Sequence, residues 1–288
     1  MKYVITTDTT CDMSQRYFDE NNVGVLALSY TIDGITYAGE GENQLSPAEF
    51  YQKLRNGSMP QTAQVNPEQA KKMFASYLER GINVLHLSFS SALSGSYQST
   101  VIAADDLNGM YGDAKVVTID SRCASMGEGL LLYYAVELKK EGKSFDEVAE
   151  WVEGHKLNIC HNFTVNDLFH LHRGGRVSKT SAVFGAMLGV KPVLHVDDEG
   201  RLIPIQKVRG RKQSLLALVD NMEKCMGNMK NDIVFISHGD CIDDAEFVAG
   251  EVKKRFGIKK IKIGFIGPVI GTHSGAGTVA LFFLGEHR

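Results

Sequence analysis

Short runs of apolar and β-branched residues alternate along the chain with longer stretches whose apolar residues recur every three or four positions. The short runs predict strands and the longer stretches predict amphipathic helices. In the first half of the chain we expect strands at 2–6, 25–32, 35–37, 84–87 and 115–119, and helices at 14–21, 46–57, 67–80, 97–107, 127–141 and 145–155. Polar residues follow several of the strands. This alternation is typical of a parallel sheet that is flanked by helices and binds its ligand at the strands' carboxyl ends.

The pattern changes near residue 160, where strands become more frequent. We expect strands at 158–165, 191–196 and 202–208, then at 233–237 and a last one at 260–265, with helices at 165–172, 214–226 and 243–256. The glycine-rich residues 267–277 are predicted to be a loop after that last strand. The prediction is therefore an α/β protein with two domains: an α/β domain over residues 1–160 and a smaller α+β domain over 161–288.

Hydroxyl groups gather where the predicted strand 84–87 meets the predicted helix 97–107. Such a corner presents unpaired amides and the positive end of a helix dipole. Because the chain has no Lys or Arg between Arg80 and Lys115, we expect an anion here to be held by hydroxyls and backbone N–H groups alone. That environment suits a carboxylate better than a triphosphate. The alternative is an ordinary cluster of helix caps and turn residues. The serines concerned are Ser88, Ser90, Ser91, Ser94 and Ser96.

Composition narrows the class of protein. The 288 residues are 43% hydrophobic and 23% charged, as in an ordinary globular protein, and a formal charge of -3 argues against a nucleic-acid surface. No apolar run approaches the ~20 residues of a membrane span, and the first residues lack a signal peptide's pattern. We therefore expect a soluble cytoplasmic protein without a nucleic-acid partner.

The five cysteines are odd in number and form no CxxC pair, so they are expected to be reduced thiols. Cys160 and His161, with His170 and His172 nearby, are candidate metal ligands by residue type. No acidic residue is spaced with them, so no metal site is predicted.

Several separated segments, taken in order, resemble the DegV family of fatty-acid-binding proteins, and together they cover nearly the whole chain. Two positions depart from the family pattern: Ala63 stands where serine often follows the threonine, and Ser96 where threonine is common. The segments are Thr62 after Met59-Pro60, the serine corner 90–99, Arg173 to Ser178 (Arg-Gly-Gly-Arg-Val-Ser), Lys191-Pro192, Val208-Arg209-Gly210, and the glycine-rich stretch 267–275.

This resemblance implies a two-domain lipid-binding protein that encloses one long-chain fatty acid, with its carboxylate at the domain interface and its acyl chain in an apolar tunnel. It implies a carrier that has no catalytic residues, no ATP site of its own and no cofactor other than the bound lipid. In bacteria that have the partner, the carrier is the binding subunit of an ATP-dependent fatty acid kinase in phospholipid metabolism. Transient contact with a membrane or an acyltransferase is also consistent with this role.

Site residues follow from the same resemblance. Thr62 and Ser94 are expected to donate hydroxyl hydrogen bonds to the carboxylate, with the Gly95 amide beside them and His273 close by. Arg173, at the mouth, is expected to meet the phosphate or the kinase subunit. For the tunnel wall we expect residues 183–190, although ordinary core packing explains them equally well.

Other readings of these residues stay open. His273 is either a donor to the carboxylate or a core histidine, and Arg173 and Arg176, which flank two glycines, either project from a mobile loop or form a solvated surface pair. Asp8 and Asp120, at strand ends, are either a paired acid–base site or, as we favour, caps and turn residues.

The rival function is a serine hydrolase for acyl esters, with Ser94 as nucleophile, His273 as base and Asp8 or Asp120 orienting the base. Against it, the corner reads Leu93-Ser94-Gly95 rather than GxSxG. The glycine-rich stretch 267–277 lacks the lysine of a phosphate-binding loop, which argues against nucleotide binding.

Overall fold

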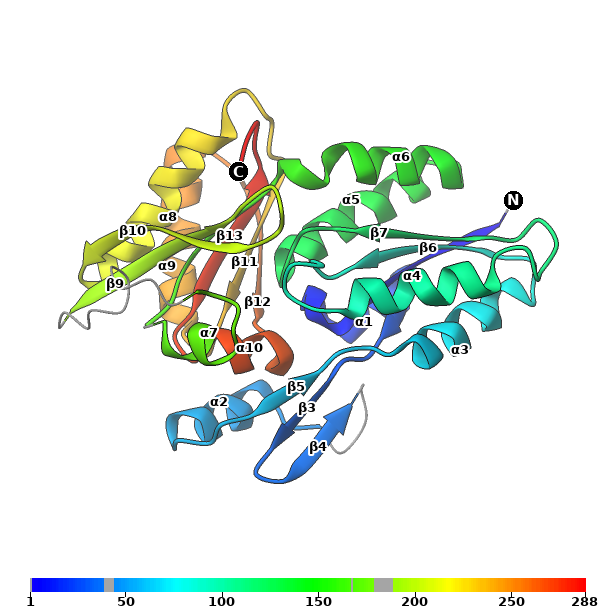
Figure 1. Cartoon of the computed structure of the whole chain (residues 1–288). Coiled ribbons are helices and arrows are strands. Elements are labelled where there is room, and N and C mark those ends of the chain that lie inside the picture. Colours follow the sequence, from blue (N-terminus) through cyan, green and yellow to red (C-terminus); the bar gives the residue numbers. More distant parts are fainter. Residues whose placement is uncertain (1, 39–43, 167, 179–188) are drawn as a thin grey trace.

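The computed structural model describes residues 2–38, 44–166, 168–178 and 189–288. Two sheets stand next to each other with helices on their faces, and a small third sheet lies below them (Figure 1). The predicted fold class is confirmed.

The first sheet has four parallel strands in the order β2-β1-β6-β7, as the alternation of strands and helices predicts. Neighbouring residues of each strand point to opposite faces, so Val4 and Val84 enter one core cluster while Ile5 and Leu85 enter another. The strands are β1 (Tyr3–Asp8), β2 (Gly24–Leu26), β6 (Asn83–Ser88) and β7 (Val116–Asp120).

Helices cover both faces of this sheet (Figure 1). The cluster that contains Val4 also contains apolar residues of α3 and α4, and the cluster that contains Ile5 contains those of α1, α5 and α6. The elements are α1 (Gln15–Asn21), α3 (Pro67–Leu78), α4 (Ser96–Leu107), α5 (Met126–Lys140) and α6 (Phe145–His155), with the 3-10 turns η1 (Thr9–Cys11) and η2 (Lys156–Asn158).

The predicted strand 25–32 is in fact two strands that belong to different sheets. After β2 the chain leaves the first sheet and forms β3 (Ser29–Ile32), which pairs with β4 (Ile35–Ala38) across the predicted Asp33-Gly34 hairpin turn. The link 59–67, predicted to be irregular, contains β5 (Gln61–Ala63), and Thr62 pairs with Tyr30 of β3. Three residues are too few for a sequence pattern, so only the pairing with β3 reveals this strand.

The second sheet has six strands in the order β10-β9-β8-β13-β11-β12. The prediction that residues 260–265 form the last strand is wrong, because β13 follows and is fully buried in the middle of the sheet. Its unbroken apolar sequence has no period that distinguishes a strand from other buried structure. The strands are β8 (Ile159–Thr164), β9 (Val190–Val196), β10 (Leu202–Arg209), β11 (Ile233–His238), β12 (Lys260–Phe265) and β13 (Val279–Leu284).

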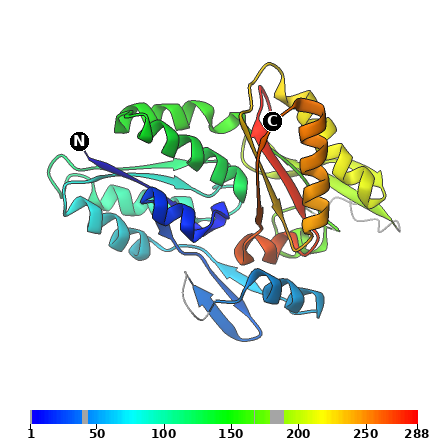
Figure 2. The ribbon, with the colours of Figure 1, turned by 180° about the vertical axis from the view of Figure 1, so that it is seen from behind.

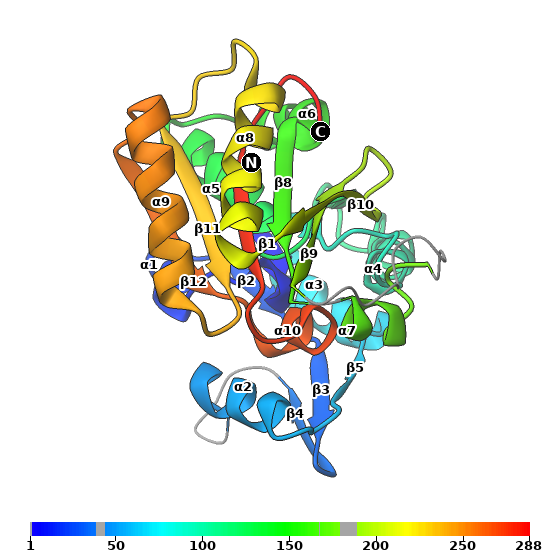
Figure 3. The ribbon, with the colours of Figure 1, turned by 90° about the vertical axis from the view of Figure 1, so that its left-hand side faces the viewer.

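Helices α8 (Arg211–Met226) and α9 (Ile242–Phe256) lie next to each other across the outer face of this sheet (Figure 3). Helix α5 packs on its inner face and also on the first sheet, so that Ile5, Leu130 and Phe282 belong to one core cluster. The two sheets therefore share a core. The domain boundary at residue 160 stays a prediction.

The glycine-rich stretch 267–277, predicted to be a loop, contains the short helix α10 (Pro268–Ser274). Helix α10 packs against α2 (Pro47–Arg55) and against β3 and β5 of the small sheet, which lie below it when the molecule is seen from behind (Figure 2). Another short helix, α7 (Phe169–Arg173), contacts α10. These contacts bring three distant segments of the chain to one place.

Candidate ligand site

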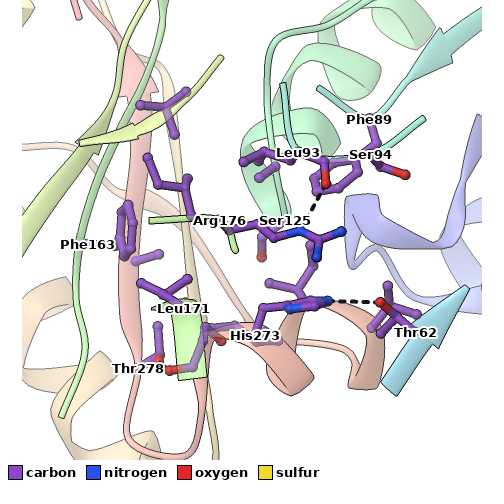
Figure 4. A pocket seen from close by; sticks show the side chains of 18 of the residues that line it. Thr62, Phe89, Leu93, Ser94, Ser125, Phe163, Leu171, Arg176, His273 and Thr278 are labelled. Carbon is purple, nitrogen blue, oxygen red and sulfur yellow. Dashed lines mark hydrogen bonds between the residues drawn. The ribbon is translucent and has the colours of Figure 1, made fainter. Parts of the chain in front are cut away.

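A cavity of about 370 Å³ lies where the two sheets, α10 and the small sheet meet. Its volume is within the range of roughly 300–1,000 Å³ that is usual for small-molecule sites. Most of its wall is apolar, and several polar groups gather at one part of it (Figure 4). The apolar lining includes Leu28, Phe89, Leu93, Phe163, Leu171, Val196, Leu202, Ile266, Val269, Ile270, Ala280 and Phe282.

Polar side chains from four distant segments line the same cavity and include Thr62 of β5, Ser94 of the serine corner, Arg176 after α7, and His273 of α10. The other polar lining residues are Gln64, Ser125, His161, Ser274 and Thr278. Thr62 Oγ1 and His273 Nε2 are hydrogen-bonded at 2.8 Å, which joins β5 to α10 (Figure 4). Ser94 Oγ lies 3.0 Å from Ser96 Oγ and accepts a hydrogen bond from the Ser96 amide. The structure thus brings together Thr62, Ser94 and His273, which are 211 residues apart at most along the chain.

His273 is a neutral hydrogen-bonding group. Burial, together with the positive charges of Arg176 and Arg173, lowers the pKa of His273 to about 4. The ring packs so closely on Gly174 that a Cβ at that position would collide with Nδ1. A neutral imidazole in this place can share hydrogen bonds with Thr62 and with a ligand's oxygen.

The serine corner is held in place from two strand ends of the first sheet. Asp8, which ends β1, accepts a hydrogen bond from the Phe89 amide at 3.1 Å. Asp120, which ends β7, accepts from both the amide and the hydroxyl of Ser91, at 3.1 and 2.6 Å. Asp8 and Asp120 therefore act as caps of the corner, as favoured from the sequence, and each has its own set of partners.

The position of Arg176 contradicts the expectation that no cation faces the serine corner. Its Nε donates to the Leu93 carbonyl at 3.1 Å and one Nη donates to the Gly174 carbonyl. Burial lowers the pKa of Arg176. Within the described residues it forms no ion pair with a carboxylate. Sequence reasoning missed Arg176 because the cation comes from a segment more than 80 residues beyond the corner.

Arg173 lies outside the inner cavity and lines a second, outer chamber of about 430 Å³. Its Nη2 donates to the carbonyls of Pro60 and Thr272 at 3.4 and 3.3 Å, so neither Arg173 nor Arg176 is simply solvated. Thr62, Arg176 and His273 line both chambers. These three side chains therefore separate the apolar interior from the outer chamber.

Gly95 precedes α4 as its N-cap residue. A Cβ at Gly95 would lie 2.5 Å from the side-chain oxygen of Gln64, and Gln64 itself lines the cavity. Gln64 is a second polar lining residue that sequence reasoning missed. Residues 183–188 of the predicted tunnel wall lie outside the described residues.

The geometry gives no support to a catalytic triad. Among the described residues, Ser94 and His273 are not hydrogen-bonded to each other, and no carboxylate orients His273. In the same part of the chain, no three His, Cys, Asp or Glu residues are arranged to hold a metal ion. None of the described helices combines the length and apolar character that crossing a bilayer requires.

Fold and cavity together define an α/β protein with an interior cavity between two sheets. The family model described as "Uncharacterised protein, DegV family" matches residues 2–286, and the chain belongs to the DegV family.

A DegV domain-containing protein of Clostridium perfringens is 45% identical over 287 residues, which cover 100% of this chain and 99% of the relative. Solved structures are similar as well. A fatty acid binding DegV family protein from Streptococcus agalactiae has a TM-score of 0.88 and 29% identity, with 100% of both chains covered. A stearic acid-binding protein from Eubacterium ventriosum has a TM-score of 0.88 and 26% identity, covering 99% of this chain and 98% of that chain.

Proposed function

We propose that this protein binds one long-chain fatty acid, with the carboxylate among Thr62, Ser94, Arg176 and His273 and the acyl chain in the apolar cavity. The observation that carries the proposal is the position of the Arg176 guanidinium. A partly buried guanidinium without a carboxylate partner in the described structure stands at the polar end of an apolar cavity, together with two hydroxyls and a neutral imidazole. Relatives with the same fold bind fatty acids, which supports this ligand class.

The energetics fit such an amphipathic ligand. A carboxylate that leaves water needs hydrogen-bond donors or a counterion, because an unpaired buried charge is very costly. Each charge-assisted hydrogen bond contributes roughly 1.5–3 kcal/mol. The tail contributes more in total, at about 0.8 kcal/mol per buried methylene. The head group therefore sets the orientation, and the tail supplies most of the affinity.

The finer proposal is that the bound carboxylate is presented to a separate ATP-dependent kinase subunit, which forms the acyl phosphate. The outer chamber supports this step, because Thr62, Arg176 and His273 line it as well as the inner cavity, and Arg173 adds a cation there. A phosphoryl group that arrives from outside would meet Arg173 first. We place this carrier role in the cytoplasm, where the kinase finds ATP.

Native mass spectrometry of protein purified from a bacterial host tests the proposal. A co-purifying fatty acid, one per chain, is the expected result. The competing hydrolase predicts an empty protein that cleaves p-nitrophenyl esters and loses this activity in Ser94→Ala. That combination would overturn the carrier function.

A further inference from the structure

The junction between β12 and α10 is held by two side chains from the N-terminal half of the chain. The Tyr51 hydroxyl donates to the Ile266 carbonyl at 2.8 Å, and the Gly267 amide donates to Asp12 Oδ1 at 2.9 Å. Ile266 and Gly267 are consecutive, so both backbone groups at the entrance to α10 are bound by the opposite half of the molecule.

Asp12 extends this junction to the cavity wall. Its Oδ2 accepts a hydrogen bond from Ser125 Oγ at 2.5 Å, and Ser125 Oγ lies 3.0 Å from Ser237 Oγ at the end of β11. Ser125 lines the cavity and has a φ of 53°, which is unusual for a residue with a side chain. Such strain persists only where the surroundings enforce it.

Packing at the junction leaves no room for adjustment. A Cβ on Gly267 would lie 2.6 Å from Asp12 Oδ1, and a Cβ on Gly271 would lie 2.6 Å from the Tyr51 hydroxyl oxygen. Tyr51 itself is fully buried. The start and the middle of α10 therefore rest directly on these two side chains.

The orientation of α10 decides where the His273 ring lies. The helix is seven residues long, with few internal hydrogen bonds, so contacts at its start strongly influence its direction. Its last turn carries His273, whose Nε2 lies 2.8 Å from Thr62 Oγ1 in the cavity wall. A shift at Gly267 would thus be transmitted to the polar end of the site.

We propose that Asp12 and Tyr51 are positioning residues for the carboxylate end of the ligand: they fix the entrance of α10 and thereby hold His273 against Thr62. This inference rests on the proposed fatty-acid site. It assigns the two residues to head-group recognition, although neither belongs to the polar end of the cavity.

The test compares palmitate with hexadecanol, which has the same tail and an uncharged head. Dissociation constants of both ligands are measured for the wild type, Tyr51→Phe, Asp12→Ala and Asp12→Asn. Tyr17→Phe is the matched control, because its buried phenol oxygen has no hydrogen-bond partner in the described part of the chain. Melting temperatures of all variants are recorded in parallel.

In Tyr51→Phe and Asp12→Ala the dissociation constant of palmitate should rise about five-fold, the equivalent of one hydrogen bond, while that of hexadecanol stays near the wild-type value. Asp12→Asn keeps an acceptor for the Gly267 amide and should restore most of the palmitate affinity. Tyr17→Phe should match the wild type for both ligands.

An equal loss of affinity for both ligands in Tyr51→Phe would show a merely structural role and overturn the inference. An unchanged palmitate affinity in this variant would overturn it as well. Tyr51→Phe removes a single oxygen atom, so it decides the matter even if Asp12→Ala does not fold. A wild-type protein that fails to bind palmitate would instead refute the fatty-acid site itself.

Discussion

Replacing Arg176 with methionine is the sharpest test of the carboxylate site. Methionine keeps an unbranched apolar chain and removes the guanidinium, which lies at the polar end of the cavity (Figure 4). In the ligand-free protein two effects oppose each other. The substitution relieves the cost of a partly buried cation, and it removes the hydrogen bonds to the Leu93 and Gly174 carbonyls. The melting temperature without ligand should therefore change by only a few degrees.

Ligand binding should change much more. The variant loses at least one charge-assisted hydrogen bond to the carboxylate, worth roughly 1.5–3 kcal/mol, so the dissociation constant of palmitate should rise about 10- to 100-fold. At saturating palmitate, the stabilisation by the ligand falls by the same free energy. With about 2–4 °C per kcal/mol for a chain of this size, the ligand-induced rise in melting temperature should be smaller by roughly 3–12 °C.

Titration calorimetry and thermal melts with and without palmitate measure both quantities. Arg173→Met is the matched control, because Arg173 is also partly buried but lines only the outer chamber. Wild-type palmitate affinity in Arg176→Met would refute the reasoning that the guanidinium is the counterion. An equal loss of palmitate affinity in Arg173→Met would show that both cations act only through their electrostatic field at the entrance of the cavity.

Three further predictions concern the remaining site residues. The double variant Thr62→Ala with Ser94→Ala should lose most of its co-purified fatty acid, while the melting transition of the lipid-free protein stays nearly unchanged; wild-type lipid content by mass spectrometry would show that neither residue is needed to hold the ligand. Arg173→Ala should bind lipid almost normally, but its bound fatty acid should be phosphorylated more slowly by a partner kinase, and an unaffected rate of acyl phosphate formation would contradict this role. The third prediction concerns pH. Because the pKa of His273 falls from 6.5 to about 4 on folding, the unfolded chain binds more protons between these values, and this residue's contribution to stability is complete above pH 6.5 and is lost as the pH falls towards 4. The glutamine of His273→Gln cannot titrate. Between pH 7 and pH 4 the free energy of unfolding should therefore fall by about 3 kcal/mol more in the wild type than in this variant, as measured by urea unfolding of ligand-free protein. Parallel pH profiles of the two proteins would argue against a buried neutral imidazole.

Local sequence patterns determined most of the first half of the molecule. Apolar periodicity and polar residues at strand ends predict a parallel α/β sheet, because these signals depend on neighbours along the chain. The same local signals identified the serine corner, and Asp8 and Asp120 at its edges. The resemblance to DegV proteins added Thr62, Ser94 and His273 as candidate site residues.

Only the tertiary structure decided how these pieces meet. Strand β5 exists because it pairs with β3, and β13 is inserted between strands that precede it in the chain. Arg176 reaches the Leu93 carbonyl of the serine corner because the preceding helix α7 packs against α10. The physical reason is the same in each case: pairing and burial depend on residues far away in sequence, whereas propensity and capping depend on near ones. The sequence by itself therefore predicted a site for a carboxylate, and only the fold placed Arg176 beside the serine corner and Asp12 and Tyr51 at the start of α10.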